Sequence, residues 1–352
     1  MLVYLLIPIA TVVLYGVDWV LMYRIKRYYL FLIAVFVLLA GISGCRSPYT
    51  GTDTMQYYTA FLSLNDMDLW NSLFGTRYEI GYAVFNRLVG LFTSNPQMFI
   101  FTESCITTAL VLFFIARNSS NVLASVLVYE CAYLYFQAFN ASRFWLGLAI
   151  ALCGFEYARK RCIVPALAFV VAGTSIHTSI AMLIIVYALF FMKRQVSDLF
   201  VFIMFCVAMI LSLFGEQLMK IYMVLFERYT AYETYDLEAS FAGFFPLFLL
   251  LLVATAIVLS QKDKLVDGDY LRRLSIPLLF SAALGFMSMD VEMATRMRPL
   301  FTVFLILFIP ELGKLKHFGS FVEIVSLVAL VFYGYTLLSV NDGQIVPYAT
   351  WI

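Results

Sequence analysis

The residues of this 352-residue chain that could do acid–base chemistry are few, and they stand in polar stretches between long apolar runs. Asp53 lies in GTDTMQYYTAF, Glu79 in RYEIGYAVFN and His177 in SIHTS. A carboxylate or an imidazole that is shielded from water can take a proton from a hydroxyl group near neutral pH. We therefore take Asp53, Glu79 and His177 as candidates for a general base.

A second set of residues could bind a phosphorylated sugar. Arginine grips phosphate oxygens through paired, charge-assisted hydrogen bonds, and the flat face of tyrosine stacks on a sugar ring. Fixed arginines can also stabilise the charge of a leaving pyrophosphate without a metal ion, and Arg143, Arg296 and Arg298 suit this task. A sugar on a lipid pyrophosphate needs both kinds of contact. The predicted substrate-binding residues are Arg46, Arg77, Arg143, Arg296, Arg298, Tyr57 and Tyr82.

Each candidate also has a purely structural interpretation. Asp53 could be a turn residue, His177 a turn histidine, and Arg296 and Arg298 anchors at lipid headgroups. The tripeptide DMD at 66–68 resembles a metal-binding D-x-D, but it is weak evidence in a loop. The six cysteines show no C-x-x-C spacing and five of them lie in or beside apolar runs. We expect no metal site and no cofactor.

Membrane-spanning helices must position these residues. With 63% hydrophobic residues, 34 Phe and a mean hydropathy of +0.91, the chain cannot bury its apolar surface in one soluble core. A helix needs about 20 apolar residues to cross a hydrocarbon core of ~30 Å. We expect an all-α polytopic integral membrane protein, a single domain over 1–352, with about twelve transmembrane helices. The apolar stretches are 3–22, 28–44, 97–116, 121–139, 143–158, 162–176, 178–192, 197–214, 241–260, 272–289, 298–313 and 319–339.

The distribution of basic residues orients these helices. With the N-terminus outside, 15 of the 23 Lys and Arg residues fall on one side, which the positive-inside rule identifies as the cytoplasm. Three regions then face outward: a large loop at 45–96, a second loop at 215–240 and a third at 288–299. Within the first, RYEIGYAVFNRLVGLF predicts an interfacial or re-entrant helix rather than a span. The net charge of +1 gives no reason to expect a nucleic-acid partner.

Two ionisable residues stand where short spans meet the outer face. The stretches 162–176 and 178–192 form a hairpin that could turn below the membrane surface, with His177 at the turn. Arg143 opens another span, and Asn140 or Ser142 would cap the helix that follows. Ionisable groups at such depth are costly unless they are paired or functional. We expect both side chains to point into a cavity on the outer side.

In order and spacing, GTDTMQYYTAF, the E-x-G-Y of RYEIGYAVFN, FNASRFWLGLAIA with YARKR, and SIHTSI resemble the EpsG-type branch of the Wzy-like polysaccharide polymerases. The resemblance covers residues 1 to 195 and continues more faintly through RMRPLFTVFLIL. The chain departs from the family at Phe144, where members often have glutamine after the arginine. At this pair of positions, the resemblance therefore carries over to Arg143 and not to Phe144.

The resemblance implies a bacterial inner-membrane enzyme that joins oligosaccharide repeat units into O-antigen or a similar surface polysaccharide. Donor and acceptor are linked to undecaprenyl pyrophosphate, the active site faces the periplasm, and a GT-C-like architecture is compatible with the pattern. The resemblance also implies that the partners are membrane lipid, a flippase and a chain-length regulator. We favour a metal-independent, inverting glycosyl transfer.

Alternatives from other classes stay open. A lipid-linked oligosaccharide flippase or other transporter also has about a dozen spans and buried charge, but it should show two similar halves and cations along a central path. The chain has no internal repeat, and its candidate residues gather on the outer side. An O-antigen ligase or an acyl transferase would keep the side of the membrane and change the acceptor.

Overall fold

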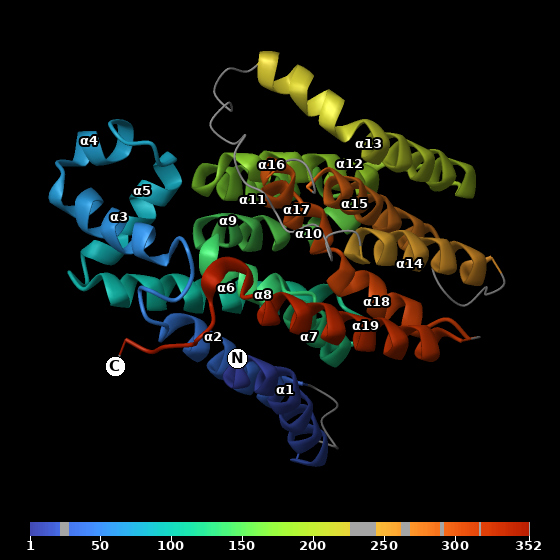
Figure 1. The fold of residues 1–352 in the computed structure, drawn as a ribbon, viewed down its shortest axis with the longest axis horizontal. Helices are drawn as coiled ribbons and strands as arrows, with labels where there is room; N and C mark the ends of the chain where they lie inside the picture. Colours follow the sequence, from blue (N-terminus) through green and yellow to red (C-terminus); the bar gives the residue numbers. More distant parts are fainter. Residues whose placement is uncertain (22–27, 226–243, 262–267, 289–291, 317, 352) are drawn as a thin grey trace. The chain divides into compact units, whose positions relative to one another are not determined.

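Helices form all the regular secondary structure in the part of the chain that the structure describes (Figure 1). The structure is a computed structural model that describes residues 1–21, 28–225, 244–261, 268–288, 292–316 and 318–351. In these ranges, the all-α prediction is confirmed. The chain forms two compact units, Met1–Tyr187 with Leu327–Ile352, and Ala188–Ser326.

The first unit contains most of the predicted site residues. Two elements run across its boundary with the second unit, α12 (Leu183–Phe191) and α19 (Gly319–Ser339). Its other elements are α1 (Leu2–Leu21), α2 (Tyr29–Gly44), α3 (Thr54–Asp66), α4 (Leu69–Phe74), α5 (Ile80–Gly90), α6 (Pro96–Asn118), α7 (Val122–Cys131), α8 (Leu134–Asn140), α9 (Ser142–Leu152), α10 (Phe155–Arg159), α11 (Ile163–Ile176) and the short 3₁₀ helices η1 (Thr178–Met182) and η3 (Asp342–Gln344).

The second unit is built around α15, which packs on both α13 and α14. Its helices are α13 (Asp198–Leu225), α14 (Phe244–Ser260), α15 (Gly268–Met287), α16 (Glu292–Met297), α17 (Pro299–Thr302) and α18 (Leu305–Gly313). Of the predicted outward loop at 215–240, residues 215–225 continue helix α13, and residues 226–240 lie outside the described residues. Residues 289–291 of the third loop also lie outside them.

Several helices have the length and composition to cross a membrane. Among the described residues these are α1, α6 and α19, with a fourth if α7 and α8 form one span bent by 49°. The backbone of Tyr133 turns at that bend with φ 66°. Other apolar helices, such as α2, α11 and α14, are shorter. The protein is therefore a helical membrane protein, and the number of twelve spans stays a prediction.

Close approach of two helices sets the position of the site. Helices α9 and α11 meet at Gly147 and Gly173, where a Cβ on Gly173 would lie 2.4 Å from the carbonyl oxygen of Gly147. Glycine pairs allow helix backbones to pack this tightly. Helix α5 approaches α11 in the same way, because a Cβ on Gly81 would lie 2.3 Å from Ser175 Oγ. Both contacts lie near the C-terminal end of α11, so α5 and α9 pack against the same part of that helix.

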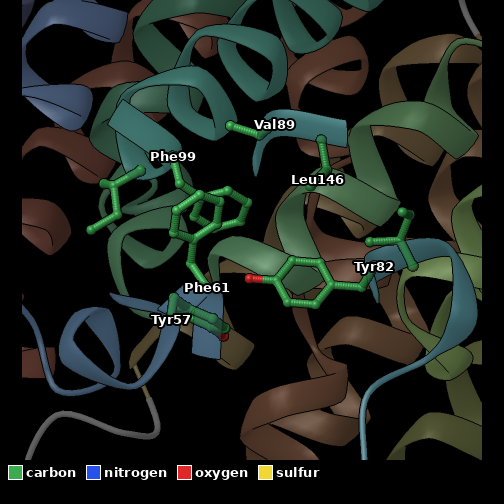
Figure 2. Packing of buried hydrophobic residues seen from close by; sticks show 8 residues of the cluster. Tyr57, Phe61, Tyr82, Val89, Phe99 and Leu146 are labelled. Carbon is green, nitrogen blue, oxygen red and sulfur yellow. The ribbon is translucent and has the colours of Figure 1, made fainter. Parts of the chain in front are cut away.

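An aromatic cluster packs at this junction of α5, α9 and α11 (Figure 2). The rings of Phe61 and Phe99 stack at 4.9 Å, and those of Tyr57 and Tyr82 meet edge to face at 6.3 Å. Tyr57 and Phe61 recur at four-residue spacing along α3, so their rings lie on one face of this helix. The cluster packs the segment 45–96, which the sequence predicts to face outward, against α6 and α9.

The C-terminal tail holds the stretch GTDT in place. Gly51 has φ +94°, a conformation that only glycine adopts without strain, and its N–H donates to Gln344 O at 3.0 Å. Asn140 connects the two segments, because it accepts from Thr52 N–H at 2.9 Å and donates to Gly343 O at 3.0 Å. The predicted capping role of Asn140 or Ser142 is wrong, since no side chain caps α9.

Replacing Gly51 with alanine should destabilise the protein by about 2 kcal/mol, because the positive φ becomes strained. The new Cβ would also lie 2.3 Å from Asn140 Oδ1. Thermal unfolding in detergent measures the effect. Gly16→Ala is the control, since nothing lies within 4 Å of a Cβ there. Equal unfolding midpoints for the two variants would show that the tail contact is dispensable.

Candidate functional site

Glu79 and Arg143 form an ion pair at the junction of α5, α9 and α11. Arg143 Nη1 contacts Glu79 Oε2, and the two side chains are 20% and 19% exposed. The other carboxylate oxygen of Glu79 accepts from both the N–H of Thr178 at 3.0 Å and its hydroxyl at 2.8 Å. The carboxylate is thus held from two sides by residues far apart in the sequence.

Two tyrosine rings flank the guanidinium. The Cζ of Arg143 lies 5.3 Å from the ring centre of Tyr78 and 5.7 Å from that of Tyr82. Such contacts orient a planar cation and leave its edges free for hydrogen bonds. Tyr78 also contacts Arg77, whose Cζ lies 5.3 Å from its ring centre. The site therefore offers a cation between aromatic walls.

His177 lies beside this pair, at the turn that links α11 to η1, as predicted. Its Nδ1 shares a hydrogen bond of 2.6 Å with Ser179 Oγ, and its ring meets Phe144 edge to face at 5.5 Å. Burial, together with the charge of Arg143, lowers the pKa of His177 to about 4, against the opposing effect of Glu79. The imidazole is neutral at physiological pH and can accept a proton.

The carboxylate of Glu79 is ionised in this setting. Burial would raise its pKa, but hydrogen bonds from Thr178 and the charge of Arg143 outweigh that effect and hold the pKa below its usual range. The site therefore combines a carboxylate, a neutral imidazole and a guanidinium. Groups that can accept a proton thus lie beside a cation.

We expect activity to stay within about twofold as the pH falls from about 7.5 to about 5.5. A lowered pKa means that His177 binds a proton only in more acidic solution, so the base form persists until the pH nears 4. Initial rates of the glycosyl transfer that the sequence leads us to expect, measured with the purified protein across this range, check the expectation. A tenfold loss per pH unit below about 6.5 would instead indicate an unshifted histidine.

The other predicted residues of the first unit differ in how far their side chains are buried. Asp53 directly precedes α3 at partial exposure, and its side chain caps no N–H. Tyr57 and Tyr82 are buried in the aromatic cluster, with Tyr82 reaching the ion pair. Arg46 is 1% exposed. Their roles toward a substrate remain proposals.

Arg296 and Arg298 belong to the second unit. Arg298 directly precedes α17, and its Cζ lies 5.4 Å from the ring centre of Phe245. Arg296 lies in the last turn of α16. Their part in pyrophosphate binding stays a prediction.

Sequence reasoning missed Thr178. It holds Glu79 through both backbone and hydroxyl, yet a threonine beside a histidine carries no distinct signal. Its position directly after His177 was the available hint. In the ranges that the structure describes, no three His, Cys, Asp or Glu side chains gather as a metal site would require.

Helices that are long and apolar enough to cross a membrane define a helical membrane protein, and three helices of its first unit hold a charged cluster. The model of the EpsG family matches residues 9–350, so the chain belongs to the EpsG family. It is also 26% identical over 179 residues to the amylovoran biosynthesis protein AmsC of Erwinia amylovora. That match covers 49% of this chain and 47% of the relative, about half of its length. No solved structure matches the chain.

Proposed function

We propose that the protein is a membrane glycosyltransferase that joins lipid-linked oligosaccharide repeat units into a surface polysaccharide. Its membership of the EpsG family supports this function, as does its likeness to a protein named for amylovoran biosynthesis. The observation that carries the proposal is the pairing of Arg143 with Glu79 beside a neutral His177. These groups match the needs of sugar transfer from a pyrophosphate.

In the proposed reaction, a hydroxyl of the acceptor unit attacks the anomeric carbon of the donor chain from the face opposite the pyrophosphate. The new glycosidic C–O bond forms as the bond to the pyrophosphate oxygen breaks, and the configuration inverts. The hydroxyl proton passes to Glu79 or His177, which are the bases at the site. The bonding electrons leave with undecaprenyl pyrophosphate, whose growing negative charge Arg143 stabilises.

The aromatic residues would guide the sugar. Tyr78 flanks Arg143 and is only partly buried, so its ring can stack on a sugar next to the pyrophosphate. We further propose that the site faces the periplasm of a bacterial inner membrane. The distribution of basic residues supports this orientation.

Deletion of the gene, followed by a gel of surface polysaccharide, tests the function. A polymerase predicts loss of the ladder of long chains with retention of single repeat units on the surface. Loss of all surface sugar would favour a flippase or a ligase. An unchanged ladder would overturn the proposal.

A further inference from the structure

A second carboxylate, Glu103, lies on α6 inside the first unit. Its side chain is 1% exposed, and its Oε2 accepts a hydrogen bond of 2.8 Å from Ser142 Oγ. Its Oε1 has no hydrogen-bond partner among the described residues. A buried carboxylate is costly unless donors or opposite charges surround it, so Glu103 needs an explanation.

Its surroundings are polar on one side. Glu103 lines a small cavity with many hydroxyl groups, and the hydroxyl of Thr107 there also has no partner among the described residues. A polar cavity of this kind suits a single water that hydrogen-bonds to the carboxylate. The other lining residues are Ser43, Ser104, Thr108, Tyr129, Tyr135, Ala138 and Ser142.

Arg46 is a buried arginine that binds Ser104, the residue next to Glu103. Arg46 donates to Ser104 Oγ at 3.1 Å and to Phe139 O at 3.2 Å, and it also contacts Ser43 O. These acceptors are neutral, and the carboxylate whose charge acts on Arg46 is that of Glu103. The positive charge of Arg46 disfavours a cation in the cavity. Glu103 thus lies next to the serine that Arg46 binds.

Ser142, the hydrogen-bond partner of Glu103, is the neighbour of Arg143 in the ion pair. Ser142 is the first residue of α9, and Arg143 is the next. No side chain caps α9, and the hydrogen bond from Ser142 to Glu103 holds the first residue of α9 against α6. The charge of Arg143 also acts on Glu103. A shift of this turn would move the guanidinium relative to Glu79 and Thr178.

We propose that Glu103 is a positioning residue: through Ser142 and through its charge, it holds Arg143 in the orientation that binds the pyrophosphate of the lipid-linked substrate. This inference rests on the proposed function. Glu103 does not touch the substrate. It acts through Arg143, so its effect should vanish when Arg143 can no longer bind.

Binding of undecaprenyl pyrophosphate to the purified full-length protein in detergent tests the proposal. We expect Glu103→Gln to raise the dissociation constant about tenfold, since a misplaced donor loses much of its binding. Ser142→Ala breaks the same link from the other end and should have a similar effect. In an Arg143→Lys background, Glu103→Gln should weaken binding no further.

Glu130→Gln is the matched control. Glu130 is also fully buried in the first unit, accepts one hydroxyl hydrogen bond, from Thr11 at 2.6 Å, and has one oxygen without a partner among the described residues. It contacts α1 rather than α9, so its variant should bind as tightly as the wild type. Thermal unfolding of each variant confirms that it is folded.

The outcomes separate the two claims. If Arg143→Lys weakens binding but Glu103→Gln and Ser142→Ala do not, the positioning role is overturned and the proposed function stands. The positioning role is also overturned if the losses from Glu103→Gln and Arg143→Lys multiply in the double variant. If Arg143→Lys binds as the wild type does, the pyrophosphate site itself is misplaced, and both proposals fail.

Discussion

Arg143→Lys is expected to lower polymer synthesis about a hundredfold although it keeps the positive charge. Arginine presents a planar fork that can contact Glu79 on one edge and phosphate oxygens on another while its faces meet Tyr78 and Tyr82. A lysine ammonium is a point charge that cannot keep these contacts together. The length distribution of surface polysaccharide, with protein abundance in the membrane, measures the loss.

Arg117→Lys is the control for this substitution. Arg117 also forms a paired contact with a carboxylate, at 2.8 Å from each oxygen of Glu156, but it is 52% exposed and belongs to no part of the site. Exposed ion pairs contribute little to stability. We expect wild-type polymer from Arg117→Lys. Near-normal chain length from Arg143→Lys would make Arg143 an anchor at the membrane surface instead.

Glu79→Gln should reduce synthesis by a similar factor, about a hundredfold. Both oxygens of Glu79 accept hydrogen bonds, from Arg143 on one side and from Thr178 on the other. An amide of the same size must turn its NH₂ group toward one of these donors, so one contact is lost. The variant also lacks the charge that could take the acceptor proton.

Glu156→Gln is the corresponding control, because Glu156 pairs with Arg117 and Lys160 away from the site. Polymer made by this variant should match the wild type. Synthesis of normal polymer by Glu79→Gln, at normal abundance, would remove the carboxylate from the mechanism and leave His177 as the base.

Local patterns were sufficient to predict much of the helical framework. The turn at His177 follows from the two apolar stretches around it and from the polar residues that separate them. The helix predicted in RYEIGYAVFNRLVGLF is observed as α5, which begins directly after Glu79, and its place at the membrane surface stays a prediction. Such features depend on neighbours within a few residues, and the sequence displays these directly.

Contacts between distant segments were beyond the sequence. Thr178 lies 99 residues from Glu79, and the tail residue Gln344 bonds to Gly51 across most of the chain. The spacing pattern that predicts a helix does not say which helix ends meet. Arg46 illustrates the consequence, since its charge suggested a substrate contact and the fold buries it beside Ser104.

Asp53 is a predicted site residue whose role an experiment must decide. It stands on the segment that the C-terminal tail holds, and its carboxylate caps no backbone N–H. A turn acid at the start of a helix would usually make that capping bond. The role of Asp53 toward a substrate stays a prediction.

Reconstituted polymerisation tests the central claim most directly. The purified protein in lipid vesicles would receive undecaprenyl-pyrophosphate-linked repeat units, with gel analysis of the products and an assay for released undecaprenyl pyrophosphate. We predict a ladder of chains, one lipid pyrophosphate released for each new linkage, and loss of both signals in the Arg143→Lys and Glu79→Gln variants. Substrate that stays as single units with wild-type protein, or a ladder that both variants still produce, would contradict the account.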